Sequence, residues 1–473
     1  MKYRQSIALL MATSVAACSV GVDVNHTQPV VAPGWHATLP HGGSTVELTN
    51  WWGSLGDKRL TQLMALAEAN SPTVGSAVAS IRAARATVRS NQSSLLPSLT
   101  ASETLSRKLG QSATASFPGG STISNIASGQ FDSSWEIDLF GKARSNVNAA
   151  KYRLAGAQAS WNDARVTLAA EVADDYVQYR GCMLTEDVYR RSLNSQNETL
   201  KATGDLVNAG LASSNDLLLA RGNAATASIT LTAQIATCEA FIKTLTQLSG
   251  GDESETRKIL GDGIRMLPRP RTFAIKSLPA DLLRQRPDIV ASEAEMAARL
   301  ADAGASAADI YPSLSLSGSL SITNGVTGWS FGPALSLPFF QGGAKRAALE
   351  YSKAQYQKQA ESYRGTVLSA VAEVETNLVK LRAARLESSD AARAADNLRQ
   401  YFNAVDENWK AGGISLLDRE TARRNSQSAD LTLISIRMDV LRQWIALFKS
   451  LGGGWSTTPG NSEPQTKTTG ALP

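Results

Sequence analysis

The sequence predicts a mainly α-helical protein with a small β part, built from tandem-duplicated long coiled-coil helices and four transmembrane β-strands per chain. Three observations lead to this fold class. Proline, the residue that interrupts helices, is absent between Gly119 and Leu267 and between Phe339 and Thr458. The same order of motifs occurs twice along the 473 residues. Segments in which apolar and polar residues alternate, as they do in β-strands, stand before each long helical stretch.

The duplication is visible as matched motifs in the two halves of the chain. The segment Leu95–Leu99 corresponds to Ile310–Leu314, and Ala209-Gly210 corresponds to Ala411-Gly412, 202 residues further on. A pattern that occurs twice predicts two similar structural repeats. We expect a signal peptide (1–17), followed by an N-terminal lipid-anchored segment with an equatorial belt (18–57). The first repeat (58–250) and the second repeat (279–451) are joined by an equatorial linker (251–278), and an equatorial tail (452–473) ends the chain.

Each repeat is expected to contain a short helix, a β-hairpin, a long helix and a return helix. The expected bounds are 72–94, 98–139, 142–209 and 215–249 in the first repeat, and 287–309, 313–338, 343–410 and 416–450 in the second. Apolar residues along the first long helix recur at spacings of three and four, the seam of a coiled coil: Val147, Ala150, Leu154, Ala157, Trp161, Ala164 and Leu168. Gly181 and Gly365 leave open the alternative of two shorter helices in place of each long one.

The predicted strands have one apolar face and one small or polar face. In 313–322, leucine and isoleucine alternate with serine. Such strands suit either hairpins on a soluble core or a transmembrane barrel with a wet lumen. Segments of about ten residues fit the hydrocarbon thickness of a bilayer, which favours the barrel. Four strands cannot close around a channel, so we expect other chains to complete it, and three copies would supply twelve strands.

The N-terminus has the features of an export signal. Lys2 and Arg4 precede an apolar run, and small residues stand before Cys18. This pattern resembles a bacterial lipoprotein signal, in which Cys18 would be acylated and become the first mature residue. An ordinary signal with an incidental cysteine is the alternative. Because Ser19 follows Cys18, and lipoproteins without aspartate there are usually sent to the outer membrane, the resemblance implies a lipid-anchored protein of that membrane.

The other two cysteines are predicted to form a disulfide. Cys182 lies 28 residues before Gly210 and Cys238 lies 28 residues after it, so antiparallel helices would place both at the same height. An exported chain matures in an oxidising compartment, where disulfides persist. Counting does not fix the direction of a side chain, so two unrelated buried thiols are the alternative.

The composition argues against several classes of function. All three histidines lie in the first 41 residues, which leaves none for acid–base catalysis, a catalytic triad or a metal site in the rest of the chain. A net charge of +5 without runs of like charge does not indicate a nucleic-acid surface. No constellation of catalytic or metal-binding residues is found. We therefore expect a protein that is not an enzyme and uses no cofactor.

A few motifs are more specific than these patterns. They are Leu278–Ile289 (LPADLLRQRPDI), Trp51-Trp52 with Asp57 and Leu60, and Pro338-Phe339 with Gly342-Gly343. With them the chain resembles the TolC-type outer-membrane efflux factors, in particular the lipoprotein (NodT-like) branch of RND efflux systems. The resemblance covers almost all of the mature chain.

The resemblance implies a homotrimer with a 12-stranded barrel in the outer membrane and a periplasmic α-barrel. Such a duct receives drugs or other small toxic compounds from an inner-membrane RND-type transporter through a periplasmic adaptor (membrane fusion) protein, and it contacts outer-membrane lipid. A general diffusion channel would share the strands but needs no long helices. A periplasmic coiled-coil scaffold would share the helices but not the strands. Both stay open as alternatives.

The resemblance also assigns roles to the turns between the long and return helices. Residues at these turns match the periplasmic tips that contact the adaptor: Gly210, Leu211, Gly412 and Gly413. Just after the second turn, Leu417 and Asp418 match positions that narrow the tunnel, and three-fold symmetry would turn each into a ring. Several relatives have an acidic residue three positions after Asp418, where this chain has Thr421. A double acidic ring is therefore not expected at this constriction.

Two alternatives concern the chemistry of this constriction. Asp418 stands where a carboxylate often serves only to start a helix, without a role in the pore. The three nearby arginines Arg419, Arg423 and Arg424 are the other alternative, since they would pair with neighbouring carboxylates and lock a closed tip.

Overall fold

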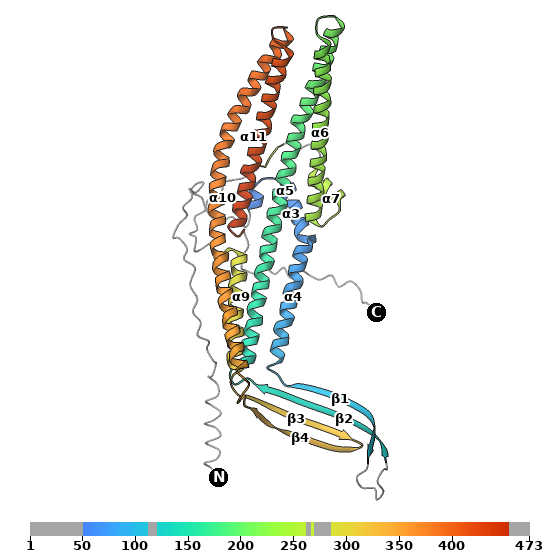
Figure 1. Cartoon of the computed structure of the whole chain (residues 1–473), viewed down its shortest axis with the longest axis vertical. Coiled ribbons are helices and arrows are strands. Elements are labelled where there is room, and N and C mark those ends of the chain that lie inside the picture. Colours follow the sequence, from blue (N-terminus) through green and yellow to red (C-terminus); the bar gives the residue numbers. More distant parts are fainter. Residues whose placement is uncertain (1–50, 112–120, 262–265, 269–284, 454–473) are drawn as a thin grey trace. The chain divides into compact units, whose positions relative to one another are not determined.

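A computed structural model describes residues 51–111, 121–261, 266–268 and 285–453, and Figure 1 shows its element order. The predicted signal peptide at 1–17 and the lipidation site Cys18 lie outside the described residues, as does the first part of the Leu278–Ile289 motif. So do most of the segments 18–57 and 452–473 and half of the segment 251–278. The chain divides into two compact units. One contains Val78–Ala159 and Ile289–Thr366, and the other contains Ser160–Asp288 and Val367–Pro473 among its segments.

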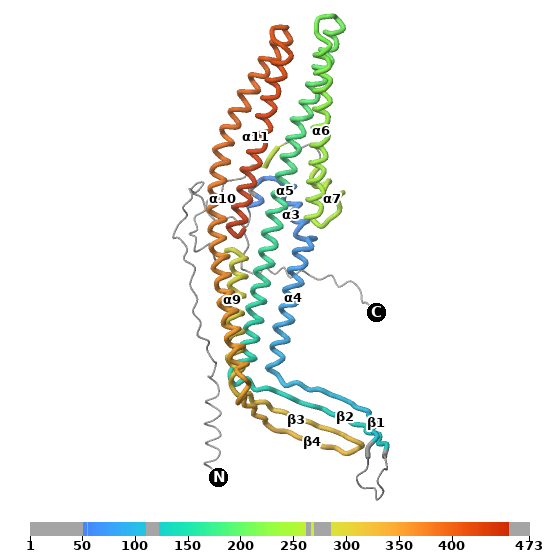
Figure 2. Tube along the Cα trace, viewed as in Figure 1, coloured from blue at the N-terminus to red at the C-terminus, as the bar shows by residue number. Residues whose placement is uncertain are grey.

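The helices occur in the order that the duplication predicts. The first repeat contains α4 (Pro72–Ser93), α5 (Lys142–Asn208) and α6 (Ser214–Ser249), and the second contains α9 (Pro287–Ala308), α10 (Ala344–Lys410) and α11 (Leu416–Ser450). Each bound lies within one residue of the expected range. Three short helices complete the described set: α2 (Trp51–Ser54), α3 (Lys58–Asn70) and α7 (Glu253–Leu260). In Figure 2, α6 runs back along α5, and α11 runs back along α10.

Both long helices are continuous, which settles the question that their glycines raised. α5 passes through Gly181 and α10 passes through Gly365 without a break, and each contains 67 residues. A β-carbon at Gly181 would overlap the side chain of Met438 on α11. Gly181 therefore allows α11 to pack closely against α5. Nothing lies within 4 Å of the corresponding point at Gly365, so packing does not explain that glycine.

The four strands form one antiparallel sheet in the order β1-β2-β3-β4. Their bounds are β1 (Ser98–Gln111), β2 (Ser121–Ile137), β3 (Ser313–Thr323) and β4 (Val326–Ser336). The register puts the apolar residues of neighbouring strands side by side, since Phe131 pairs with Leu320 and Leu320 pairs with Trp329. The next row is polar and contains Asp132, Ser319 and Ser330. From the lower half of β2 through β3 and β4, one face of the sheet is therefore mainly apolar, and the other carries hydroxyl, carboxyl and amide groups. On β1 the alternation is weaker, because Glu103 and Arg107 lie on the same face as Leu105.

In the unit that contains the sheet, charged side chains fix α9 against both long helices. Arg153 of α5 pairs with Glu295 (3.5 Å) and with Asp302 of α9. Lys142 of α5 and Lys345 of α10 (3.0 Å) both reach the carboxylate of Asp309. Despite burial, the hydrogen bonds from these two lysines hold the pKa of Asp309 below its ordinary value. α9 therefore lies between the long helices of the two repeats.

In the other unit, the core surrounds a buried cluster of large side chains. Trp51 stacks on Phe448 with ring centroids 4.9 Å apart, and Tyr176, Leu245 and Trp444 belong to the same core. The motif that contains Trp51-Trp52 therefore attaches α2 to the end of α11.

Asp57 connects this core to α5. Its carboxylate accepts from the Arg59 amide (3.1 Å), the Tyr176 hydroxyl (2.6 Å) and the buried Arg180 guanidinium (3.1 Å). Burial, together with the bond to Asp57, raises the pKa of Tyr176, so its hydroxyl stays protonated and donates. Arg180 also donates to the carbonyl of Met266. One carboxylate thus starts α3 and holds it against α5.

Arg286 explains part of the Leu278–Ile289 motif. Its guanidinium makes two bonds to Asp288 (3.0 and 2.7 Å), and it reaches Glu373 of α10 (2.8 Å) and the carbonyl of Ser450 at the end of α11 (2.7 Å). Gln285 lies against Gly452, which has a left-handed backbone conformation. A β-carbon on Gly452 would come within 2.6 Å of the carbonyl oxygen of Gln285. The motif therefore fixes the start of α9 at the place where α11 ends.

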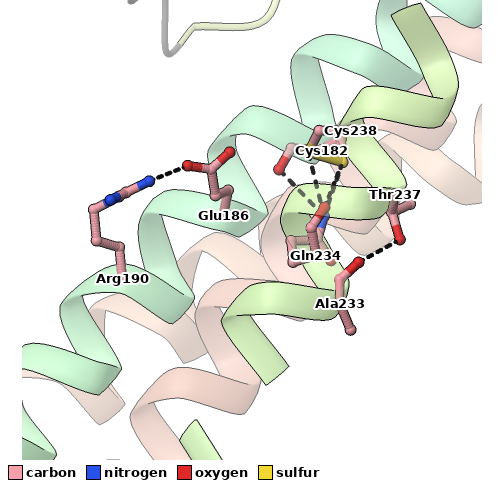
Figure 3. The surroundings of a disulfide bond; sticks show 7 residues. All are labelled: Cys182, Glu186, Arg190, Ala233, Gln234, Thr237 and Cys238. Atoms are coloured by element: carbon pink, nitrogen blue, oxygen red, sulfur yellow. Dashed lines mark hydrogen bonds and ion pairs between the residues drawn. A yellow bond between two sulfur atoms is a disulfide. The ribbon is translucent and has the colours of Figure 1, made fainter. Parts of the chain in front are cut away.

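Cys182 of α5 and Cys238 of α6 form a disulfide, which Figure 3 shows. Their α-carbons are 5.5 Å apart, and both residues are buried. The amide group of Gln234 donates to the carbonyl of Cys182 (3.3 Å) beside the sulfur atoms. At the corresponding positions of the second repeat, 202 residues on, the chain has Ala384 and Val440. The first helix pair is therefore covalently linked at a level where the second is held by packing.

We predict that Cys182→Ala/Cys238→Ala lowers stability by about 2–4 kcal/mol, because the bond closes a long loop in the unfolded chain. Thermal unfolding of the purified protein, followed by circular dichroism, should show a lower transition temperature in this double variant. Reduction of the wild-type protein should lower the temperature in the same way and should leave the double variant unchanged. An equal transition temperature in all samples would contradict a stabilising role.

Candidate functional site

The turn from α5 to α6 is a helix end that requires glycine. The amide of Leu211 donates to the carbonyl of Leu206 (2.8 Å), and the amide of Gly210 donates to the carbonyl of Val207 (3.0 Å). These two bonds make a Schellman motif, whose central residue is left-handed. Gly210 supplies that conformation with a φ of 72°. Leu211, the next residue, is 76% exposed at the tip.

The turn from α10 to α11 repeats this construction. Gly413 donates to the carbonyl of Asn408 (2.9 Å), Gly412 donates to that of Trp409 (2.9 Å), and the φ of Gly412 is 78°. Both glycines are exposed. The two tips therefore present backbone and small side chains outward, except for Leu211.

Ser415 begins α11 and engages Asp418. The Ser415 hydroxyl accepts from the Asp418 amide (3.2 Å) and donates to its carboxylate (2.6 Å). A carboxylate in the first turn also meets the positive end of the helix dipole. Asp418 thus has the contacts expected of a residue that starts a helix, while the residue as a whole stays exposed. In the first repeat, Ser213 caps α6 through the Asn215 amide (3.1 Å), with Asp216 in the first turn.

The three predicted constriction residues share one exposed side of α11. Leu417 is 61% exposed, and Thr421, one turn further along, is exposed as well. The Thr421 hydroxyl donates to the carbonyl of Leu417 (2.8 Å), so it is satisfied within the helix. Asp418 contributes the acidic group of the first turn to this side.

The opposite side of α11 carries a buried arginine. Arg419 is 4% exposed and reaches Asp406 of α10 (2.6 Å), Thr199 of α5 (2.6 Å) and its neighbour Glu420 (3.1 Å). Its guanidinium also lies over the ring of Trp409, 4.5 Å from the centroid. Although burial acts in the other direction, hydrogen bonds from Lys410 and Arg419 hold the pKa of Asp406 below its ordinary value. Arg419 therefore joins three helices just inside the tip.

Glu420 extends this polar network along α5. Its carboxylate, 4% exposed, accepts from Gln196 of α5 (2.6 Å) and from Arg423 (2.9 Å). Arg423 also donates to Ser192 of α5 (2.6 Å). Among the described atoms, the carbonyl oxygen of the Gln196 side chain is buried without a hydrogen-bond partner. We name Gln196, Thr199, Arg419, Glu420 and Arg423 the tip network.

The tip network holds α11 on α5 through buried polar and charged groups. Moving these groups apart costs free energy as long as they stay buried without a partner. A buried ion pair adds little net stability, but a single partner left behind in the interior costs about 3–5 kcal/mol. If water enters as the helices part, both partners are solvated again. Such an arrangement favours two states, closed and fully separated.

Sequence reasoning anticipated some of these contacts and missed others. Arg419 and Arg423 do pair with carboxylates, whereas Arg424 reaches the Thr421 hydroxyl (3.5 Å). The roles of Gln196, Thr199 and Glu420 were not anticipated. A signal was present, because Gln196 and Thr199 are one turn apart on the face of a coiled-coil helix that is otherwise expected to be apolar.

The part of the chain that the structure describes contains neither a metal-ligand cluster nor a membrane-spanning helix. There, no group of three or more His, Cys, Asp or Glu side chains is arranged to hold a metal ion. None of the described helices combines the length and the hydropathy of a membrane span.

Comparison with known proteins places the chain among outer-membrane channels. The family model described as "Outer membrane efflux protein" matches residues 63–251 and 278–453. Outer membrane protein OprJ of Pseudomonas aeruginosa is 27% identical over 458 residues, with 95% of each chain covered. Nodulation protein T of Rhizobium leguminosarum bv. viciae is 28% identical over 462 residues, which cover 95% of this chain and 93% of the relative.

Solved structures agree with this relationship. The outer-membrane channel OprN is 27% identical and has a TM-score of 0.80, with 93% of this chain and 100% of that chain covered. The CmeC outer-membrane channel of Campylobacter jejuni shares the fold at 21% identity, with a TM-score of 0.80 over 94% of this chain and 96% of that chain. The chain belongs to the outer membrane efflux protein family.

Proposed function

We propose that three copies of this chain form the outer-membrane exit duct of a tripartite efflux pump for drugs or other small toxic compounds. The observation that carries this proposal is the four-stranded sheet, in which β2, β3 and β4 share one mainly apolar and one polar face and whose edges are β1 and β4. Three such sheets joined edge to edge make a twelve-stranded barrel. Its apolar face would meet lipid and its polar face a wet lumen.

Names of relatives support export as the task. One relative from Pseudomonas putida is an antibiotic efflux pump outer membrane protein, ArpC, and another from the same species is a toluene efflux pump outer membrane protein, TtgC. Each is 28% identical to this chain over 474 residues. A general diffusion channel would need no pair of 67-residue helices, and a coiled-coil scaffold would need no apolar sheet face.

In this proposal the remaining parts have defined partners. Cys18 carries the lipid anchor. The tips at Gly210, Leu211, Gly412 and Gly413 contact a periplasmic adaptor protein, which links the duct to an inner-membrane RND-type transporter. Small residues at a tip let helices of a partner approach its backbone closely, and Leu211 offers an apolar contact.

The gate in this proposal has two parts on opposite sides of α11. Leu417, Asp418 and Thr421 line the constriction, where three Asp418 carboxylates repel each other and attract cations. The tip network holds α11 on α5 and keeps the constriction narrow. The partners supply the energy that opens it.

Membrane fractionation and chemical cross-linking test the assembly. The full chain, expressed in a Gram-negative host, is expected in the outer-membrane fraction, to cross-link as a trimer and to form channels in planar bilayers. A dimer in the soluble fraction would support the scaffold instead. A membrane protein with a large ungated conductance would support the diffusion channel.

Asp418→Asn should lower the cation preference of the channel and keep its helix cap, because asparagine retains an oxygen that can accept from Ser415. Single-channel recordings in a salt gradient measure this preference. The matched control is Ser415→Ala, which removes the cap contact, costs about 1 kcal/mol of helix stability and leaves the carboxylate in place. Equal loss of selectivity in both variants would assign Asp418 to the helix start alone.

Glu420→Gln should favour the open state. The substitution removes the carboxylate that accepts from the buried Arg419 (3.1 Å) and the part-buried Arg423 (2.9 Å). Loss of one partner of a buried ion pair costs about 3 kcal/mol or more, roughly a hundredfold in an equilibrium. Planar-bilayer recordings are expected to show a higher open probability. Glu407→Gln, on an exposed side chain that pairs with Lys410, is the control and should leave gating unchanged. Wild-type gating in both variants would remove the tip network from the mechanism.

A further inference from the structure

The β1–β2 hairpin is longer than the β3–β4 hairpin beside it (Figure 1). β3 and β4 end at the two-residue turn Asn324-Gly325, which has a left-handed backbone (φ of 49° and 84°) and a sequence typical of tight hairpins. The Asn324 amide donates to the carbonyl of Ala127 (2.9 Å), so the second hairpin accompanies β2 up to this residue. Six further residue pairs join β1 and β2, without a third strand among the described residues. We name this segment, 106–111 with 121–126, the free ribbon.

The backbone of the free ribbon is unsuited to the hydrocarbon of a membrane. Past Ala127, one edge of β2 has no neighbouring strand in the described part of the chain. Lipid does not tolerate such an open edge, because nothing there satisfies the backbone groups. The ribbon is at the end of the sheet opposite to Ile137, where the chain continues toward α5. In the proposed duct, whose long helices are periplasmic, the ribbon therefore projects from the outer leaflet.

One face of the free ribbon is amphipathic. In the register of the sheet, Arg107 and Leu109 of β1 lie on the same face as Phe131, which belongs to the apolar face. Leu109 is 72% exposed, and Ile123, its partner on β2, is 58% exposed. Arg107 is exposed as well, and it makes no hydrogen bond or ion pair with the described residues. An arginine on the lipid-facing side of a barrel costs far less stability at the membrane interface than at mid-depth, so this face suits the headgroup layer.

Glu103 is a second charge on the same face. It is exposed and lies four residues from Arg107 toward the apolar band, about 13 Å along the strand. A lipid that suits both residues needs an anionic group beside Arg107 and hydrogen-bond donors between that group and its hydrocarbon chains. Glycerophospholipids have only ester groups below the phosphate, and esters cannot donate to a carboxylate. Lipid A, the phosphorylated glycolipid of lipopolysaccharide, has amide and hydroxyl donors at this level.

We propose that this face of the free ribbon binds lipid A in the outer leaflet. The Arg107 guanidinium donates to a phosphate of the lipid, a pairing that its planar, two-pronged geometry favours. Glu103 accepts from the amide and hydroxyl groups below the phosphate. Leu109 and Ile123 contact carbon atoms of the sugar rings and acyl chains. The proposal rests on the proposed exit duct and adds a lipid-binding surface to it.

Lys108 provides a matched control within the same ribbon. It follows Arg107 directly, carries the same charge and is also exposed. Because side chains alternate along a strand, Lys108 lies on the opposite face, together with Ser124, its partner on β2. In the proposed barrel this is the face of the wet lumen. A lipid bound on the outside therefore distinguishes Arg107 from Lys108, whereas a general attraction of anions to the ribbon does not.

Native mass spectrometry of the full-length protein in detergent, titrated with lipid A, measures the binding. Wild type and Lys108→Gln should bind lipid A with similar dissociation constants. Arg107→Gln should bind about tenfold more weakly, because hydrogen bonds between charged groups account for at least that factor. Lipid A without its phosphates should bind wild type as weakly as intact lipid A binds Arg107→Gln. Phosphatidylglycerol, an anionic lipid without the amide donors, should bind wild type more weakly than lipid A does.

The outcomes separate this proposal from the exit duct. Light scattering and planar-bilayer recordings first establish whether each variant is a trimeric channel. A trimeric channel that binds no lipid A, or whose Arg107→Gln and Lys108→Gln variants bind it equally, overturns the proposed surface and leaves the duct intact. Equal affinity for phosphatidylglycerol and lipid A overturns the assignment to the glycolipid. A wild-type protein that is neither trimeric nor forms channels overturns the duct and the lipid surface together.

Discussion

The open edges of the sheet are the constraint on which the rest of the structure depends. A strand in lipid must have every backbone amide and carbonyl bonded, because the bilayer core offers no water. Within one chain β1 and β4 each have a neighbour on one side only among the described strands. The chain is therefore complete only in a closed ring with other copies.

Duplication supplies each copy with two similar helix pairs. The two repeats have the same order of elements, so α5 and α6 have their counterparts in α10 and α11. The repeats have nevertheless diverged where their tasks differ. The disulfide between Cys182 and Cys238 links α5 to α6, whereas the tip network joins α11 to α5 through polar groups. The first contact is covalent, and the second consists of groups that water can solvate again.

The sequence predicted those parts of the fold that depend on local periodicity. Proline-free length indicated α5 and α10, alternation indicated the sheet, and equal counts from Gly210 brought Cys182 and Cys238 to one height. The tip network was beyond this reasoning, because Gln196 and Glu420 are 224 residues apart and meet only through the rotation of each helix about its axis. Asp418 was placed at a helix start, but its reciprocal contact with Ser415 needed coordinates.

In the proposed gate, the polar character of the contact between α11 and α5 has a physical advantage. An apolar junction gains stability from burial, and its separation exposes that surface to water at a cost of about 25 cal/mol per Å². A buried ion network gains little over its solvated components, so the closed and hydrated open states can lie close in free energy. Partly open states leave charges such as Arg419 and Glu420 unpaired and are disfavoured. If the proposed duct opens fully on contact with its partners and closes fully without them, Arg419 and Glu420 therefore serve it better than leucines at the same positions.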